Sequence, residues 1–201
     1  MREESMGVSR QQAAENRSAI VAAAERLFRA RGVDAVGLTE LMKEAGFTQG
    51  GFYNHFKSKD ALVAAVMEKA MQDRTDSPAA DRLDKQVAAY LSPTHRDNVA
   101  GGCPLSGFAG DAPRLTDAAR ACYARGLAAY LERLERLVAA DGTAHADARR
   151  DTIAVFSQMV GALVLSRAIA GTDAALADEI LDAARHALVD GIGDPAASAQ
   201  A

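Results

Sequence analysis

Residues 46–59, with the sequence GFTQGGFYNHFKSK, decide the fold of this chain. Gly46 follows a helical run and suits the position just past a helix end, where a positive φ angle is common. Thr48 is predicted to be the N-cap of the next helix, its hydroxyl accepting a hydrogen bond from a backbone N–H. Phe47 and Phe52 have the spacing of a hydrophobic staple across that cap. The stretch is therefore predicted to form a tight turn followed by a short helix.

The outward face of this short helix is suited to contact with a partner. Phe56 follows Phe52 by one turn, so both rings are expected to point into the core. Two adjacent glycines cost about 1 kcal/mol each relative to alanine in a helix, and they allow a backbone to approach a grooved partner closely. A short exposed helix after a tight turn has the shape of a helix-turn-helix reader of the DNA major groove. Its small and polar positions are Gln49, Gly50, Gly51, Tyr53, Asn54 and His55.

The charge distribution agrees with DNA binding but does not by itself predict it. The net charge of −4 argues against a protein that coats nucleic acid through an overall positive charge. Residues 1–60 carry 9 Lys and Arg against 8 Asp and Glu, and the remainder carries 14 against 19. The acidity thus lies outside the proposed reading stretch, as DNA binding requires.

Cysteine content and apolar segments predict a cytoplasmic protein. Cys103 and Cys122 form neither a disulfide framework nor a four-ligand metal set, so a reducing compartment without a bound metal or cofactor is expected. The N-terminus lacks the apolar segment of a signal peptide. The most apolar run, residues 153–170, is interrupted by polar residues and is expected to be a buried helix rather than a membrane span.

Helical periodicity covers most of the chain and predicts an all-α fold. The first helix is expected to begin with a capping box at Ser9 and Gln12, and Pro93 is expected to end a helix. Residues 1–8 and 193–201 are expected to be disordered tails. Outside the reading stretch, the predicted helices cover residues 9–32, 37–45, 58–71, 81–92, 116–141, 146–170 and 173–192.

Specified positions between residues 10 and 65 form a pattern that resembles the N-terminal domain of the TetR-like (TetR/AcrR) transcriptional regulators. The pattern is Arg17-x-x-Ile20, Ala24-x-x-Leu27-Phe28, Gly32, Leu41, Ala45-Gly46-Phe47-Thr48, Gly50, Phe52-Tyr53-x-His55-Phe56-x-Ser58-Lys59-x-x-Leu62. Two positions depart from the family, which usually has Ser or Thr in place of Gly37, and Thr, Ser or Asn in place of Gly51. The second departure removes a hydroxyl, so only a backbone contact is expected at Gly51.

The resemblance implies which residues touch DNA. Gln49, Gly50 and Asn54 are expected to face base edges, and a glutamine side chain can bind adenine through two hydrogen bonds. Phosphates are expected to be held by Tyr53, His55 and Lys59, and a lysine at the start of a helix is an unfavourable dipole partner unless a phosphate lies nearby. Tyr53 can also be read as an aromatic at the edge of the core, and His55 as a neutral surface histidine. The full predicted set is Arg17, Thr48, Gln49, Gly50, Gly51, Tyr53, Asn54, His55 and Lys59, although Arg17 can equally be read as solvating its helix.

The glycine-rich segment 94–111 leaves three alternatives open for Cys103. It can be a small buried loop residue, or a sensor thiol for electrophiles or oxidants if nearby cations lower its pKa. Some TetR-like regulators sense through a cysteine after glycine, although that similarity is short. It can also be a catalytic thiol, which requires His95 within hydrogen-bond distance and an orienting third group, such as Asp97.

The resemblance also implies the domain organisation and the activity. Residues 9–57 are expected to form a helix-turn-helix DNA-binding domain, and residues 58–192 a helical effector-binding and dimerisation domain, with helix 58–71 linking the two. The last two long helices are expected to form the homodimer interface. The protein is thus predicted to be a cytoplasmic, ligand-responsive repressor of a near-palindromic operator, with neither enzymatic activity nor membrane association. Predicted effector contacts are Met67, Met71, Tyr90, Phe108, Tyr123, Phe156 and Met159.

Overall fold

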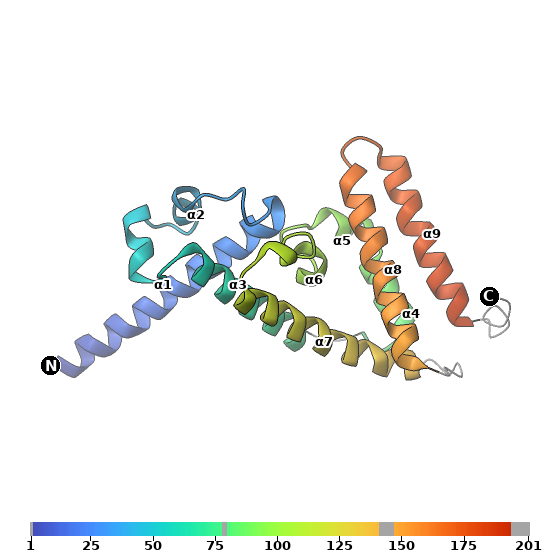
Figure 1. Ribbon diagram of the computed structural model, residues 1–201, viewed down its shortest axis with the longest axis horizontal. Helices are drawn as coiled ribbons and strands as arrows, with labels where there is room; N and C mark the ends of the chain where they lie inside the picture. The colour runs from blue at the N-terminus through green and yellow to red at the C-terminus, as the bar shows by residue number, and fades with distance from the viewer. Residues whose placement is uncertain (1, 78–79, 141–146, 194–201) are drawn as a thin grey trace. The chain divides into compact units, whose positions relative to one another are not determined.

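The computed structural model confirms that the chain is helical (Figure 1). It describes residues 2–77, 80–140 and 147–193, with side chains described for residues 10–77, 80–140 and 147–189. The elements are α1 (Arg2–Arg31), α2 (Leu38–Glu44), η1 (Gln49–Asn54), α3 (Lys59–Asp76), α4 (Leu83–Tyr90), α5 (Pro93–Asp97), α6 (Pro104–Gly107), η2 (Ala112–Arg114), α7 (Asp117–Ala140), α8 (Ala148–Ile169) and α9 (Ala174–Gly193).

The chain divides into two compact units. The first contains residues 1–73 and 103–125, and the second contains residues 74–102 and 126–201. The division falls within α3 and within α7. The sequence-based division at residues 57 and 58 is a functional one, and it stays a prediction.

The core of the first unit lies behind the helix-turn-helix segment. Ile20 and Phe28 of α1, Leu41 of α2, Phe52 of η1 and Leu62 of α3 are fully buried. Burying such a side chain contributes about 1.5–3 kcal/mol. These residues occupy the apolar positions of the sequence pattern, so the same hydrophobic contacts that fold the unit also fix the orientation of η1.

The turn between α2 and η1 has the conformation that the sequence predicts. Gly46 has a φ angle of 82°, in the left-handed region that glycine adopts without strain. Its N–H donates to the carbonyl of Lys43, and the N–H of Phe47 donates to the carbonyl of Met42. These two hydrogen bonds form a Schellman motif, which ends α2 and sets the direction of η1.

Three expectations about the ends of helices were wrong. α1 starts at Arg2, so Ser9 lies inside the helix instead of capping it. Of the predicted tails, Met1 and residues 194–201 lie outside the described residues. Thr48 is the N-cap residue of η1, as predicted, but its hydroxyl accepts no hydrogen bond from the described N–H groups. η1 is a 3₁₀ helix whose first turn is closed by the Gly51 N–H donating to the Thr48 carbonyl. Pro93 begins α5 instead of ending a helix, because proline at the first helical position loses no hydrogen bond there.

Residues 103–125 complete the first unit by packing against α1 and the loop that follows it. The Asp111 carboxylate is buried and accepts a hydrogen bond from the backbone N–H of Val33 at 3.3 Å. Arg114 forms an ion pair with Asp111 at 2.9 Å. A side chain at Gly107 would meet the Arg29 stem at 3.1 Å, so α6 approaches α1 closely at this glycine.

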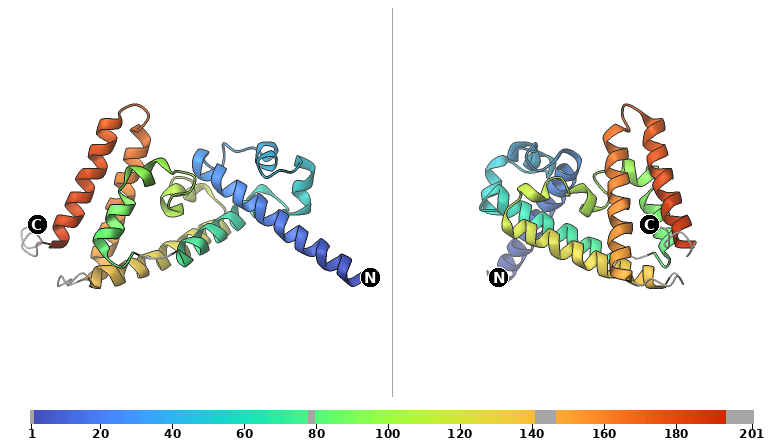
Figure 2. Two further views of the ribbon diagram at one scale, coloured as in Figure 1. Left: turned by 180° about the vertical axis from the view of Figure 1, so that it is seen from behind. Right: turned by 45° about the vertical axis from the view of Figure 1, so that its right-hand side comes forward.

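The second unit is organised around the pair α8 and α9, which lie side by side in all views (Figure 2). α4 contacts both of these helices, and α5 contacts α8. Leu163 of α8 and Ala177 and Leu181 of α9 are buried. The Ser166 hydroxyl donates to the carbonyl of Ala177 at 2.8 Å, which ties α8 to the start of α9.

α8 is long and apolar enough, by length and composition alone, to cross a membrane. Its polar residues, however, make contacts within the folded unit. Arg167 donates hydrogen bonds to the backbone carbonyls of His95 and Arg96 at 2.8 and 3.0 Å. α8 is buried on one side only, since Ile153, Val164 and Leu165 are exposed, so the expectation of a buried helix is correct for one face.

Candidate DNA-reading surface

η1 presents a polar face to solvent and an apolar face to the core. Gln49, Gly50 and Asn54 are exposed, whereas Phe52 is fully buried. Tyr53 is 69% exposed, and its ring meets the Phe52 ring edge-on at 5.3 Å between centroids. The helix therefore has the exposed hydrogen-bonding surface that the sequence predicts, mounted on a buried aromatic anchor.

The two glycines of η1 are not required by the packing of the protein itself. A Cβ atom added at Gly50 would meet no described atom within 4 Å. One added at Gly51 would make ordinary contacts with Met42 and Thr48 at 3.8 and 3.9 Å. Since neither φ angle is positive, backbone strain does not explain these residues. The absence of side chains here leaves room for the close approach of an outside partner.

The side chain of Gln49 is held by a residue of the preceding helix. Thr39 lies in the first turn of α2, and its hydroxyl donates a hydrogen bond to Oε1 of Gln49 at 2.7 Å. Both side chains belong to exposed residues. No local sequence pattern points to Thr39, because its partner Gln49 lies ten residues away across the turn.

His55 and Arg17 border the polar face of η1. His55 is half-buried and its ring lies 6.4 Å from that of Phe47. Arg17 is exposed, with its guanidinium 4.7 Å above the ring of Phe56. The Phe56 contact positions Arg17 next to η1 without covering it. Phosphate contacts by both residues stay predictions.

Lys59 has an internal role that the sequence did not reveal. Its ammonium donates hydrogen bonds to the backbone carbonyls of Val33 and Val36, both at 2.7 Å, and lies 5.8 Å from the ring of Phe28. A lysine ammonium has three N–H donors, so these carbonyls use two of them. The side chain thus fixes the α1–α2 loop to the start of α3, and a phosphate contact at Lys59 stays a prediction.

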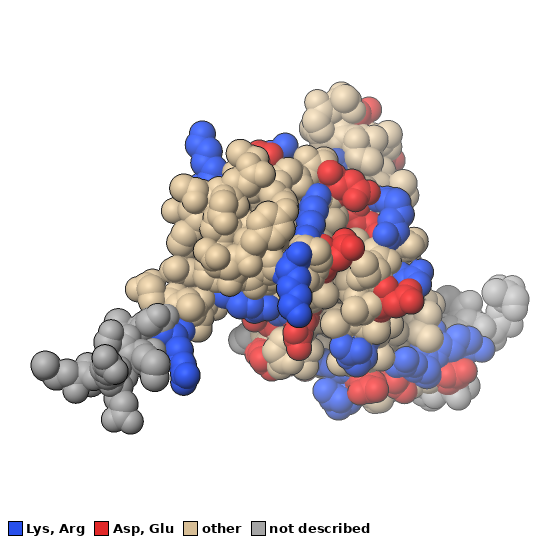
Figure 3. All heavy atoms as spheres, turned by 60° about the vertical axis from the view of Figure 1, so that its left-hand side comes forward, with Lys and Arg blue, Asp and Glu red and all other residues tan. Residues whose placement is uncertain are grey.

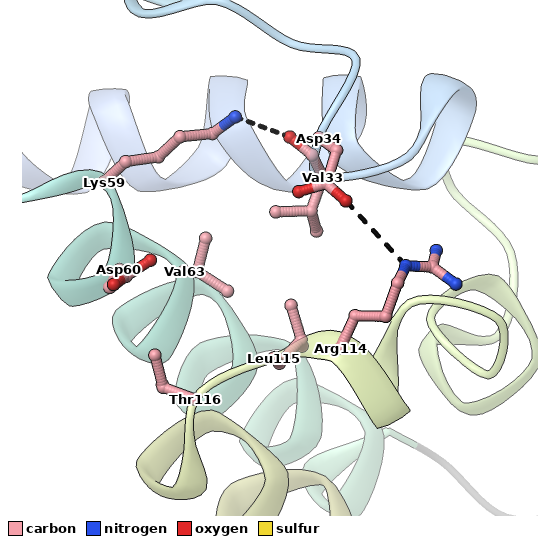
Figure 4. Close-up of a pocket in the computed structure, with 8 residues that line it drawn as sticks. All are labelled: Val33, Asp34, Lys59, Asp60, Val63, Arg114, Leu115 and Thr116. Atoms are coloured by element: carbon pink, nitrogen blue, oxygen red, sulfur yellow. Dashed lines mark hydrogen bonds and ion pairs between the residues drawn. The ribbon is translucent and has the colours of Figure 1, made fainter.

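A cavity of about 250 Å³ lies beside this loop in the first unit (Figure 4). Val33, Val63 and Leu115 give it apolar walls, and Arg114 faces Asp34 across it at 3.8 Å. None of the seven predicted effector contacts lines it. The remaining lining residues are Lys59, Asp60 and Thr116.

The predicted effector contacts are distributed between the two units. Met67, Met71, Phe108 and Tyr123 belong to the first unit, and Tyr90, Phe156 and Met159 to the second. All except Tyr123 are buried. Tyr123 donates its hydroxyl to the carbonyl of Leu105 at 2.7 Å, and burial, with the Cys103 charge as the smaller cause, raises the Tyr123 pKa. Effector binding at these residues stays a prediction.

Cys103 occupies a buried position at the N-cap of α6. Its carbonyl accepts hydrogen bonds from the Ser106 hydroxyl and the Gly107 N–H, both at 3.0 Å. Burial lowers the pKa of the nearby Arg29, and the charges of Glu25, Cys103 and Asp73 oppose that shift. The burial favours the reading of Cys103 as a small loop residue.

His95, the base required by a catalytic reading of Cys103, is held within the second unit. Its Nδ1 donates to the carbonyl of Tyr90 at 2.7 Å, and its ring meets the Tyr90 ring at 4.6 Å. Burial lowers the pKa of His95; the hydrogen bond to Tyr90 raises it in part, and the charges of Arg167 and Arg74 lower it further. These contacts account for His95 as a structural residue. Among the described residues, no group of three or more His, Cys, Asp or Glu side chains is arranged to hold a metal ion.

Charged side chains of both signs are interspersed on the face shown in Figure 3. In the first unit, Arg26 pairs with Glu44 at 3.4 Å, and Arg31 pairs with Glu40. Such a surface produces only a weak net long-range field, because neighbouring opposite charges screen each other.

The geometry defines a class of protein: an all-α chain with an N-terminal helix-turn-helix domain followed by a helical domain. Comparisons with known proteins relate the N-terminal part of the chain to a family. Residues 20–66 match the model of the bacterial regulatory proteins called the tetR family. The match covers these residues only and shows that the N-terminal domain is of the tetR type.

Curated relatives match over less than half of this chain. The regulator TtgR of Pseudomonas putida is 33% identical over 79 residues, which cover 39% of this chain and 38% of TtgR. AcrR of Shigella flexneri is 42% identical over 60 residues, which cover 30% and 28%. The matched stretch thus spans about a third of the length of these relatives.

Solved structures match over both units. The reduced form of E. coli NemR has a TM-score of 0.70 at 21% identity, covering 88% of this chain and 96% of that chain. A TetR transcriptional regulator from Chloroflexus aurantiacus has a TM-score of 0.71 at 24% identity, covering 92% and 97%. At this identity the likeness establishes the fold, which confirms the predicted all-α architecture.

Proposed function

We propose that this protein is a cytoplasmic, homodimeric transcriptional repressor that binds a near-palindromic DNA operator and leaves it when a small molecule binds. The observation that carries the proposal is the exposed polar face of η1, mounted on the buried Phe52 and oriented by the Schellman turn at Gly46. The match of residues 20–66 to the tetR family supports it.

Residues of η1 and its flanks carry the contacts. Gln49 and Asn54 read base edges in the major groove, where a carboxamide can bind adenine through two hydrogen bonds. The glycines at 50 and 51 let the backbone approach the sugar–phosphate chain. Phosphates are held by Tyr53, His55 and the residues bordering them, which fix the register but not the sequence. This division is supported by the exposure of Gln49, Asn54 and Tyr53.

The dimer forms through α8 and α9. Apolar side chains on these helices remain exposed in the single chain: Leu165 is 60% exposed, and Ile153, Val164 and Leu176 are exposed as well. Grouped exposed apolar residues favour an interface. A two-fold dimer presents two identical reading heads, which is why the operator is near-palindromic.

The effector acts by a difference in affinity between two arrangements of the dimer. A ligand that binds better to the arrangement with mis-spaced heads lowers the DNA affinity by that preference and no more. α3 is the transmitting element in this proposal, because it starts at Lys59 next to η1 and continues along the chain to Asp76 in the second unit.

Binding to the DNA upstream of the protein's own gene tests the proposal. Fluorescence anisotropy is measured at several salt concentrations for the wild type and for Gln49→Ala. We expect wild-type affinity to fall steeply with salt, and Gln49→Ala to lose about 1–3 kcal/mol of discrimination at one base pair. Lys85→Ala, at an exposed position of α4, is the control, and its DNA binding should equal that of the wild type. Absence of salt-dependent wild-type binding would contradict the proposal.

A further inference from the structure

We infer that Thr39 is a positioning residue for sequence recognition: it holds the Gln49 carboxamide in the pose that reads a base. The inference rests on the proposed DNA-binding function and adds to it a residue outside η1. The observation is the 2.7 Å hydrogen bond from the Thr39 hydroxyl to Oε1 of Gln49.

Fixing the carboxamide matters because Gln49 is exposed and its side chain has several rotatable bonds. Without a partner it would sample many rotamers, and it would lose that freedom on binding a base edge. Thr39 restricts it in the free protein, so less conformational entropy is lost on the DNA. The hydrogen bond therefore favours base recognition by preorganisation.

The hydrogen bond leaves the reading groups of Gln49 available. A carboxamide oxygen has two acceptor positions, and the nitrogen has two N–H donors. Thr39 uses one acceptor position of Oε1. The second acceptor position and the Nε2 donors match the N6 amine and N7 of adenine in the major groove. Thr39 thus supports the base contact without competing for it.

The position of Thr39 in the fold suits this role. α2 carries buried Leu41 and Met42 and is joined to η1 by the Schellman turn, so the two helices are fixed relative to each other. The N-cap of α2 is Gly37, whose lack of a side chain leaves the cap without a hydroxyl or carboxylate. The Thr39 hydroxyl, two residues further along the chain, is directed to Gln49.

The test compares Thr39→Val, which keeps the shape and removes the hydroxyl, with Thr39→Ser, which keeps the hydroxyl. Each is titrated against the operator and against its single base-pair variants. We expect Thr39→Val to reduce the preference at one base pair by about 2- to 12-fold, the value of one neutral hydrogen bond. Thr39→Ser should retain the preference. In a Gln49→Ala background, Thr39→Val should have no further effect.

The contrary outcomes are distinct. If Thr39 instead contacts a phosphate, Thr39→Val weakens binding equally at all sequences, which overturns the inference. An unchanged base preference overturns it as well. In both cases wild-type binding survives, and so does the proposed function. If the wild type shows no salt-dependent binding to DNA, the proposed function itself fails. Thermal unfolding of each variant checks that the fold is retained.

Discussion

Individual glycines in the reading segment serve different physical purposes. Gly46 has a φ angle of 82°, where an L side chain is strained even in open space. Gly50 has an ordinary φ angle and no described atom within 4 Å of an added Cβ. The first glycine therefore relieves backbone strain in the fold, and we propose that the second serves contact with a partner.

Alanine substitutions separate the two purposes. We expect Gly46→Ala to lower the free energy of unfolding by about 1–2 kcal/mol, measured by urea denaturation. Gly50→Ala should not destabilise the fold, because alanine is favoured over glycine inside a helix by about 1 kcal/mol, and it should weaken DNA binding. Gly110→Ala is the matched control, since its site is also open, its φ angle is not positive and it lies outside the reading segment. A stable Gly46→Ala, or Gly50→Ala with wild-type DNA affinity, would count against this assignment.

His95 makes the second unit sensitive to mild acid. Its pKa is lowered from 6.5, chiefly by burial. Between that lowered pKa and about 6.5 the unfolded chain binds more protons than the folded protein, so the free energy of unfolding falls as the pH falls through this window. Above the window, His95 adds no pH dependence.

Melting temperatures measured between about pH 5 and pH 8 test this expectation. His95→Gln should reduce the fall in melting temperature on the acid side. His186→Gln, at an exposed position of α9, serves as the matched control. An identical pH profile for wild type and His95→Gln would show that His95 is not responsible.

At the scale of elements, the α1–α2 loop is held from two directions. Lys59 donates to the carbonyls of Val33 and Val36, and Asp111 accepts from the N–H of Val33. The loop immediately precedes α2, and α2 carries Thr39. Its hydrogen bonds therefore contribute to the placement of the reading surface.

Lys59→Met should lower the free energy of unfolding by about 1–3 kcal/mol, because methionine keeps the aliphatic stem and leaves two carbonyls without a charged donor. Lys57→Met, at an exposed neighbouring position, is expected to change it by less than about 0.5 kcal/mol. Chemical denaturation measures both. Equal stability of the two variants would mean that the carbonyl contacts contribute nothing.

The sequence predicted those elements that depend on local geometry and periodicity. Gly46 and the alternation of Phe52 with exposed neighbours were sufficient to predict the turn and the two faces of η1. The position of the Thr48 cap was correct, but its side-chain hydrogen bond and the Pro93 helix end were wrong, because a residue type allows more than one role near a helix terminus. The roles of Lys59 and Asp111 depend on contacts across 26 and 78 residues, and a local pattern carries no information about such pairs.

At the scale of the whole molecule, the exposed apolar residues of α8 and α9 predict the oligomeric state. We expect Leu165→Glu to produce monomers, since Leu165 is 60% exposed in the single chain and the substitution leaves the unit's own core intact. Light scattering coupled to gel filtration measures this. Affinity for a two-half-site operator should fall by about 100-fold or more, as one head replaces two.

Ala128→Glu, on an exposed position of α7, is the matched control and should remain dimeric. A dimeric Leu165→Glu would place the interface elsewhere.

The hydrogen bond between the Val33 N–H and the Asp111 carboxylate has a consequence for the engineering of chimeric regulators. A graft that exchanges only residues 20–66 for those of a relative would replace the loop around Val33, and the buried Asp111 carboxylate would keep its hydrogen bond only if the new loop places a backbone N–H at the same point. Hybrids that exchange residues 103–125 together with residues 20–66 keep both partners of this hydrogen bond from the same protein. The transferable module of this protein is therefore discontinuous in the chain.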